Sequence, residues 1–317
     1  MGVLRRRVLK FGGTSVGSAA PLGAALAIAA DAAAERPVVV VVSALAGVTV
    51  ALEAALGGAA ARRLDADGFV AALGARHTAL LDRVATGRPA ARATAAVRTR
   101  LAELARRLKA VAAAGAAAPA DRAAVLAAGE RLSAPVFAAG LAAQGRDARA
   151  LDAGAIVRTD AAFAEADVDL EATRALAREA VGALGLAAVP VVTGFIGATQ
   201  AGETTLLGRG ASDLTAAILG WALDAERVEI WSDVPGVLDA DPRSVPTAAT
   251  IPWLSYAEAT RLARAGARVL HPRTLEPLAD AGIPVFVGST LRPDGPGTWI
   301  AAAPLDAAGA DVDGTAA

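Results

Sequence analysis

The stretch Val8-Leu9-Lys10-Phe11-Gly12-Gly13-Thr14-Ser15-Val16 organises the interpretation of the whole chain. It predicts a short buried strand that carries a lysine and ends in a turn of two glycines and two hydroxyls. Because glycine has no Cβ, backbone amides can converge on an anion there, and a helix expected to begin at residues 18–21 adds its positive dipole end. Lys10 precedes the glycines, unlike the lysine of a P-loop, so it would meet a phosphate from the sheet side. An ordinary tight turn is the alternative interpretation.

Composition limits the class of protein. The chain has 317 residues, which is enough for one large domain or two small ones. Its net charge of -1 provides no field to attract nucleic acid, and the absence of cysteine excludes disulfides, thiolate metal sites and a cysteine nucleophile. The most apolar stretch, residues 37–52, is too short and too interrupted to span a membrane, and the N-terminus lacks a signal-peptide pattern. We therefore expect a soluble cytoplasmic protein.

Valine-rich segments alternate with segments rich in alanine and leucine, which is typical of a mainly parallel sheet covered by helices on both faces. The expected strands are residues 7–11, 37–43, 148–151, 189–193, 227–232 and 284–287. No strand pattern appears between residues 50 and 143, so we expect a helical excursion there, interrupted near residues 87–89 and 118–119. Ligands of such a sheet gather at the carboxyl ends of its strands.

Several polar residues stand near expected strand ends or helix starts. Ser43 and Thr49 follow the second strand, where a helix-capping turn explains them as well as a ligand does. Glu130 lies at the start of an apolar helix, where an exposed first-turn acid is the simpler interpretation. His77, within the helical excursion, is interpreted as a structural histidine on a partly exposed helix face rather than as a general base.

The segment 204–213 is more informative. Two glycines flank Arg209, whose planar guanidinium suits a carboxylate or a phosphate. Asp213 begins a helix four residues later, where it either caps the helix or faces reacting groups. A cap alone does not need an arginine between glycines, so we favour a functional role. Residues 231–243 then form a stiff loop that either holds a nucleotide or is only a crossover turn.

Six motifs, in this order along the chain, resemble those of the aspartokinases. They are K-F-G-G-T-S at 10–15, S-A-x-x-G-V-T at 43–49, G-E-R-L-S at 129–133, L-G-R-G-x-S-D at 207–213, S-D-V-P-G to D-P-R at 232–243 and G-A-R-V-L-H-P-R-T at 266–274. The resemblance covers about residues 7–300. It implies the α/β amino acid kinase fold, a three-layer αβα sandwich with a mainly parallel central sheet.

The resemblance also implies an activity and a division of the chain. Aspartokinases transfer the γ-phosphoryl group of ATP to the side-chain carboxylate of L-aspartate, the first step toward lysine, threonine and methionine. The catalytic domain is expected at residues 1–302, with an amino-acid-binding lobe at about 1–200 and a nucleotide-binding lobe at about 201–302. A disordered tail is expected at residues 303–317.

Residue roles follow from the resemblance. Lys10 would neutralise charge on the transferring phosphoryl group, and Asp213 would orient Lys10. Arg209 would grip a carboxylate of aspartate, while Glu130 would hold its ammonium group. The other residues expected in the site are Ser43 and Thr49 at the substrate and Gly12, Gly13, Ser15, Ser232, Asp233, Gly236, Asp241, Arg243 and Arg268, together with Lys10, at the nucleotide.

The implied chemistry needs no general base, because a carboxylate nucleophile is already ionised at pH 7. Alignment and charge neutralisation suffice, which agrees with the lack of a catalytic histidine or cysteine. We expect ATP and Mg²⁺ as cofactors, with the metal held by phosphates and water and no dedicated protein ligands. The expected partners are L-aspartate and ATP, with no nucleic acid and no membrane. A homodimer and a separate regulatory subunit both stay open.

The chain departs from the family pattern at several places, among them Val50, where Asn is common, and Leu238, where Tyr is common. Arg268 stands where the family usually has lysine, and Ala211 stands where it usually has a glycine, which would be strained at a positive φ. Aspartokinases usually continue past a segment like residues 297–300 into ACT-type regulatory domains, so we expect feedback control through this chain to be missing. Two alternatives therefore stay open: a kinase of the same fold acting on another carboxylate, and a weakly catalytic protein that binds a nucleotide or amino acid.

Overall fold

The computed structural model describes residues 5–208, 210–240, 245, 247–264, 270 and 272–305. The strands are β1 (Arg7–Phe11), β2 (Val38–Val42), β3 (Asp147–Leu151), β4 (Ala188–Thr193), β5 (Ile196–Ala198), β6 (Thr204–Leu206), β7 (Arg227–Ser232), β8 (Trp253–Leu254), β9 (Val285–Ser289) and β10 (Thr298–Ile300). The helices are α1 (Gly13–Val16), α2 (Ala19–Glu35), α3 (Val48–Ala60), α4 (Ala66–Val84), α5 (Gly87–Ala114), α6 (Pro119–Leu126), α7 (Ala128–Ala143), α8 (Leu170–Ala183), α9 (Ser212–Ala222), α10 (Tyr256–Arg264), α11 (Pro272–Asp280) and the short 3₁₀ helix η1 (Ala153–Ala155).

An eight-stranded sheet forms the middle of the protein, in the order β3-β4-β2-β1-β7-β9-β10-β8. The strands from β3 to β9 in this order are parallel, whereas β10 runs antiparallel to β9 and β8 runs parallel to β10. Strands β5 and β6 form a separate antiparallel hairpin. The mainly parallel sheet expected from the sequence is therefore confirmed.

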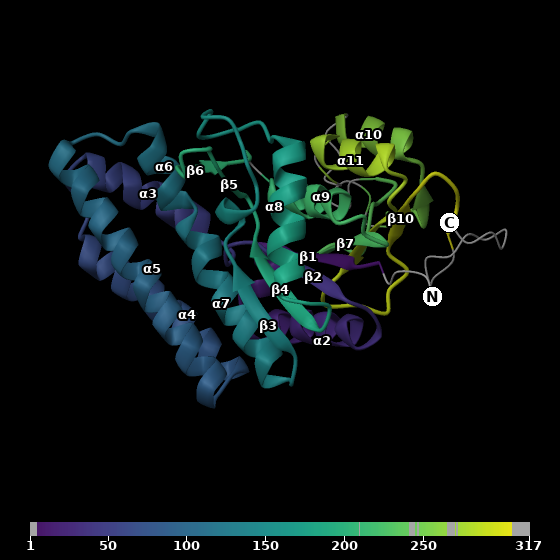
Figure 1. The fold of residues 1–317 in the computed structure, drawn as a ribbon, viewed down its shortest axis with the longest axis horizontal. Helices are drawn as coiled ribbons and strands as arrows, with labels where there is room; N and C mark the ends of the chain where they lie inside the picture. Colours follow the sequence, from purple (N-terminus) through teal and green to yellow (C-terminus); the bar gives the residue numbers. More distant parts are fainter. Residues whose placement is uncertain are drawn as a thin grey trace.

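Helices cover both faces of this sheet, which makes three layers (Figure 1). Helices α2 and α7 contact each other; α2 also contacts β1 and β2, and α7 contacts β2, β3 and β4. Helix α9 contacts β1, β2 and β7, and α8 and α11 pack against α9. All five valines of β2 are at most 1% exposed, as expected of a strand covered on both sides. Phe137 of α7 stacks on Phe11 of β1 with ring centroids 5.3 Å apart, which fixes α7 over the end of that strand.

The strand register brings the functional segments to one edge. Phe11 pairs with Val42 on one side and with Trp231 on the other, and Val42 pairs in turn with Thr193. Because these strands are parallel and end at nearly the same level, the loops that follow them meet at the carboxyl edge of the sheet. The motifs at 10–15 and 43–49 and the start of the motif at 232–243 therefore lie near one another.

The helical excursion expected between residues 50 and 143 is present as helices α3 to α7 (Figure 1). Its breaks fall at residues 61–65, 85–86, 115–118 and 127. Two of them adjoin the breaks expected near 87–89 and 118–119, since Gly87 already belongs to α5 and Pro119 starts α6. By length and composition, one described helical stretch, Pro119–Ala143, could cross a membrane. However, 83% of its most apolar window is buried inside the protein, which is the position of a core helix.

Other features differ from the sequence-based expectations. Strands β5, β6, β8 and β10 and the single-turn helix α1 were not predicted, because segments of two to four residues carry no periodic pattern. His77 is wholly buried on α4 instead of partly exposed, and its Nδ1 lies 2.8 Å from the carbonyl oxygen of Leu73. Of the expected tail, residues 303–305 are described, and the remainder lies outside the described residues.

Candidate active site

The turn after β1 places a lysine beside a glycine at the sheet edge. Gly12 lies next to the ammonium group, since a Cβ on it would come 3.5 Å from Lys10 Nζ, which is an ordinary contact distance. The amide of Gly12 donates to the carbonyl oxygen of Trp231 at 3.1 Å. This amide is thus used inside the fold, contrary to the expectation that it would face a phosphate. The chain then forms α1, which was expected to be a turn before a helix beginning at residues 18–21.

Lys10 and Asp213 are brought together from distant parts of the chain. Lys10 Nζ lies 2.6 Å from Asp213 Oδ1, and the two side chains are 9% and 18% exposed. Their contact is an ion pair that is not aligned as a hydrogen bond. Asp213 lies in the first turn of α9, so a helix start and a strand end together hold the pair. A partly buried ion pair of this kind fixes the position of an ammonium group next to the glycine turn.

Ser15 lies beneath this turn rather than on its open side. Its side chain is 2% exposed, and its Oγ lies 2.7 Å from Thr290 Oγ1 and 3.4 Å from the carbonyl oxygen of Trp231. The hydroxyl therefore ties α1 to the ends of β7 and β9. Any contact of Ser15 with a nucleotide would have to come from its backbone.

The backbone of the loop after β2 contacts the backbone of the glycine turn directly. The amide of Ala46 donates to the carbonyl oxygen of Gly13 at 3.0 Å. A Cβ on Gly13 would lie only 2.8 Å from the carbonyl oxygen of Ala44, so a larger residue has no room there. Ser133 Oγ also donates to the carbonyl oxygen of Ser43 at 2.7 Å. Glycine at position 13 is thus required by close approach of two loops.

Glu130 completes the support of this loop and keeps one oxygen without a partner. Its Oε1 accepts a hydrogen bond of 3.0 Å from the amide of Ala44, whereas its buried Oε2 has no hydrogen-bond partner. The residue is 3% exposed, so it is not the exposed first-turn acid that was the simpler interpretation. Burial raises the pKa of Glu130 to about 8, against the opposing effect of the Ala44 amide.

A large cleft of about 1440 Å³ opens beside these groups. The predicted site residues that line it are Gly13, Ser43, Thr49 and Glu130. Gly208 and Gly210 also line it and have positive φ angles of 97° and 76°, which favour glycine. The residue between them, Arg209, lies outside the described residues. Ala211 has a φ of -73°, so the alanine found there causes no backbone strain.

The predicted nucleotide loop follows β7. Ser232 Oγ accepts a 3.3 Å hydrogen bond from the amide of Val234, and Asp233 is exposed. Gly236 has a φ of 144°, and a Cβ there would lie 2.6 Å from Thr298 Oγ1, so this position also requires glycine. Three further residues predicted at the nucleotide lie outside the described residues: Asp241, Arg243 and Arg268.

Sequence reasoning missed one wall of the cleft. Residues 161–165 line it, and Leu206 donates its amide to the carbonyl oxygen of Phe163 at 2.9 Å. No motif marks this loop, and only its position after β3 at the carboxyl edge of the sheet could have suggested it. Arg76 was missed as well. Its Nη2 donates to the carbonyl oxygen of Ala46 at 2.8 Å and so supports the loop after β2 from α4.

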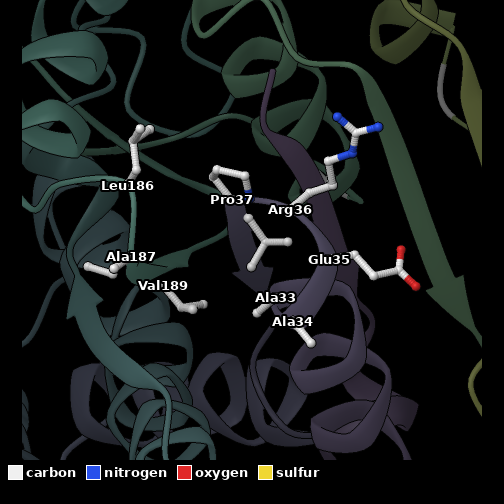
Figure 2. A pocket seen from close by; sticks show the side chains of 10 residues that line it. Ala33, Ala34, Glu35, Arg36, Pro37, Leu186, Ala187 and Val189 are labelled. Atoms are coloured by element: carbon white, nitrogen blue, oxygen red, sulfur yellow. The ribbon is translucent and has the colours of Figure 1, made fainter. Parts of the chain in front are cut away.

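Within the described ranges, no group of three or more His, Asp or Glu side chains is arranged to hold a metal ion. A smaller hollow of about 270 Å³ lies at the opposite edge of the sheet, between the end of α2 and the start of β4 (Figure 2). Its lining is mostly apolar, and its two charged residues, Glu35 and Arg36, pair with Arg7 and Glu226. We assign no chemistry to this hollow.

Known proteins resemble this chain in sequence. A model of the amino acid kinase family matches residues 5–289. The aspartokinase of Chlamydia muridarum is 34% identical over 295 residues, which cover 93% of this chain and 63% of that protein. The lysine-sensitive aspartokinase 3 of Escherichia coli is 42% identical over 172 residues, which cover 54% of this chain and 38% of that protein.

Solved structures extend the similarity to the fold. E. coli aspartokinase III in complex with aspartate and ADP superposes with a TM-score of 0.84 and 35% sequence identity, covering 93% of this chain and 64% of that one. The same enzyme in complex with lysine and aspartate has a TM-score of 0.81 and also 35% identity. The chain thus spans less than two thirds of the length of each of these relatives.

Proposed function

The chain belongs to the amino acid kinase family, and we propose that it transfers the γ-phosphoryl group of ATP to the side-chain carboxylate of L-aspartate. One geometric observation carries the proposal. The buried Glu130, whose Oε2 has no partner, lines the same cleft as Gly13, which belongs to the turn that directly follows Lys10, the partner of Asp213. An amino acid held at the first group would present a carboxylate to the second. Similarity to aspartokinases over most of the chain supports the choice of aspartate.

Glu130 is assigned to the ammonium group of the substrate. An ammonium ion beside Glu130 Oε2 would supply the missing hydrogen-bond donor and favour the ionised carboxylate. Arg209 is assigned to a carboxylate of aspartate, on the basis of its motif and of the cleft position of Gly208 and Gly210. Ser43 and Thr49, which line the same cleft, are assigned to hydroxyl contacts with the bound anions.

The nucleotide is assigned to the loop after β7 and to the glycine turn. Gly236 lets that loop pack closely against Thr298, and Ser232 and Asp233 begin the same loop. Asp241, Arg243 and Arg268 remain part of the proposed nucleotide site on their motifs alone. The division into an amino-acid-binding lobe before about residue 200 and a nucleotide-binding lobe after it is likewise part of the proposal.

The chemistry is an in-line displacement. An oxygen of the aspartate side-chain carboxylate forms a bond to the γ-phosphorus, the bond from that phosphorus to the β–γ bridging oxygen breaks, and ADP leaves with that electron pair. Lys10 would draw charge from the phosphoryl oxygens, and Asp213 would hold Lys10 in place. No proton has to be removed, so the buried His77 has no catalytic part.

Magnesium fits the site only as an ion carried by ATP. Asp213 is already paired with Lys10, and the described residues offer no cluster of three metal ligands. Mg²⁺ prefers to keep several waters and to bind through phosphates, and when bound it neutralises charge on the β- and γ-phosphate oxygens. The protein side chains would then orient the complex rather than hold the ion.

The test is a turnover assay on the purified protein with ATP, Mg²⁺ and a panel of carboxylate substrates. With L-aspartate we expect ADP release and, in the presence of hydroxylamine, formation of the aspartyl hydroxamate. Glutamate, N-acetylglutamate and water should give much slower ADP release. Lys10→Ala should greatly slow turnover. Lys109→Ala, which removes an exposed lysine paired with Asp67 on the helical excursion, is the matched control and should keep the wild-type rate. Faster turnover with another acid would overturn the choice of substrate.

A further inference from the structure

We propose that Arg131 is a positioning residue that sets the spacing between the two halves of the aspartate site. It joins the first turn of α7, which carries Glu130, to β6, which leads into the segment that carries Arg209. This inference rests on the proposed function, because it concerns the site where aspartate is expected to bind. Arg131 is not among the residues that line the cleft, so it would act through other residues.

The guanidinium of Arg131 contacts two other segments at once. Its Nε donates to Asp152 Oδ2 at 2.7 Å, and its Nη2 donates to Thr204 Oγ1 at 3.1 Å. Asp152 directly follows β3 and also accepts a 3.0 Å hydrogen bond from the amide of Gly154, which fixes its carboxylate at the start of η1. Thr204 is the first residue of β6. One side chain therefore connects α7, the end of β3 and the β5–β6 hairpin.

The contacts of Arg131 are shielded from water. The side chains of Arg131 and Asp152 are 17% and 24% exposed, so their attraction is less screened than that of a surface ion pair. The planar guanidinium of arginine can donate one hydrogen bond to the carboxylate and another to the hydroxyl in a fixed geometry. The ammonium group of a lysine is a point charge on a flexible stem and lacks this geometry. The structure thus uses a feature specific to arginine.

Both ends of this connection lie close to the proposed substrate contacts. Glu130 precedes Arg131 in the chain and lines the cleft, and its buried Oε2 has no hydrogen-bond partner. Four residues after Thr204 comes Gly208, which lines the cleft and begins the glycine pair around Arg209. A shift of β6 relative to α7 would change the distance between the groups assigned to the ammonium and the carboxylate of aspartate.

The Lys10 side of the site is held by different contacts. The glycine turn bonds to Trp231, and Ser15 bonds to Thr290, with no contribution from Arg131. Loss of the Arg131 contacts should therefore weaken aspartate binding much more than ATP binding. Because misplacement of reacting groups by about 1 Å costs on the order of 100-fold in rate, even a partial shift should be measurable.

The experiment compares Arg131→Gln and Arg131→Lys with a matched control, Arg100→Gln. Arg100 also reaches Asp152, at 3.5 Å, and pairs with Glu103 on its own helix, but no hydrogen bond joins it to Thr204 in the described structure. We expect Arg131→Gln to raise KM for aspartate about tenfold and KM for ATP less than about twofold, with partial rescue in Arg131→Lys, which keeps the charge. Arg100→Gln should change both KM values less than about twofold.

A second measurement does not depend on activity. Hydrogen exchange of a peptide covering residues 196–208 in the ligand-free protein should become faster in Arg131→Gln and stay unchanged in Arg100→Gln. Equal increases in both KM values, or unchanged exchange in the hairpin, would overturn the inference. If the wild-type protein makes no acyl phosphate from aspartate, the proposed function fails, and the exchange data still decide whether Arg131 holds the hairpin.

Discussion

The buried carboxylate of Glu130 leads to a strong prediction for the pH dependence of substrate binding. In the free protein its pKa is raised to about 8 by burial, so at neutral pH it is mostly protonated. The ammonium group of aspartate requires the ionised form. With a pKa of about 8, the ionised fraction is roughly 1% at pH 6 and one half at pH 8. If only this form binds, KM for aspartate falls about fifty-fold between pH 6 and pH 8.

The assay is steady-state ADP release at saturating ATP, with aspartate varied at each half unit of pH from 6 to 8.5. Glu130→Gln keeps an oxygen that can accept from the amide of Ala44 but never carries a charge. We expect this variant to have a high KM for aspartate that does not change with pH. Glu171→Gln, on the exposed first turn of α8, is the matched control and should keep the wild-type profile.

Stability should respond to the same group in the same pH range. The folded-state pKa of Glu130, about 8, lies above the ordinary value of 4.5, so the folded protein holds a proton that the unfolded chain releases. This bound proton stabilises the folded protein fully below about pH 4.5. The stabilisation is lost as the pH rises to about 8, and the free energy of unfolding then falls by at most on the order of 5 kcal/mol. Glu130→Gln should lack this loss. A wild-type KM that is flat from pH 6 to 8, or an unchanged profile in Glu130→Gln, would refute the reasoning.

Three further perturbations test other parts of the structure. Lys10→Ala should lower kcat by at least about 100-fold with little change in KM for aspartate, because its contact strengthens as charge moves in the transition state; an effect confined to KM would contradict this. Gly13→Ala should reduce both activity and Tm, since the new Cβ would lie 2.8 Å from the carbonyl oxygen of Ala44. Its control is Gly23→Ala on α2, where the new Cβ would have no other atom within 4 Å; this variant should raise the free energy of unfolding by about 0.5–1 kcal/mol. Burial lowers the pKa of His77 from 6.5 to about 4, so stability should fall by up to about 3 kcal/mol as the pH drops from 6.5 to 4. The urea midpoint of His77→Gln should lack this acid-dependent fall; an equal fall in both proteins would assign it to other groups.

The parts of the fold that the sequence predicts are those with long apolar patterns. The five valines of β2 and the run around Leu9 indicate parallel strands before any coordinates, because a strand buried on both faces has to be apolar throughout. In contrast, β10 and β8 depend on pairing with β9 and with each other, and segments of three and two residues carry no signal of that pairing.

The candidate site was predictable where a motif required unusual backbone geometry. The glycines at 13, 208, 210 and 236 stand at positions of close approach or positive φ, so their patterns were informative, whereas Gly12 has a φ of -72° and no contact that excludes a Cβ. Burial was not predictable from the motifs. Glu130 was indistinguishable from an exposed first-turn acid, since only the packing of α7 against the loop after β2 removes it from water. Ser15 was quoted for its hydroxyl, yet that hydroxyl bonds to Thr290, which follows β9 and lies more than 270 residues away in the sequence.

The central claim is that the edge of the sheet near Lys10 joins the γ-phosphoryl group of ATP to a carboxylate oxygen of aspartate. The most direct measurement is the ³¹P spectrum of the product made from aspartate labelled with ¹⁸O in its side-chain carboxylate. We predict an acyl phosphate whose phosphorus resonance is shifted by one directly bonded ¹⁸O. An acyl phosphate without that shift, or release of inorganic phosphate alone, would contradict the account.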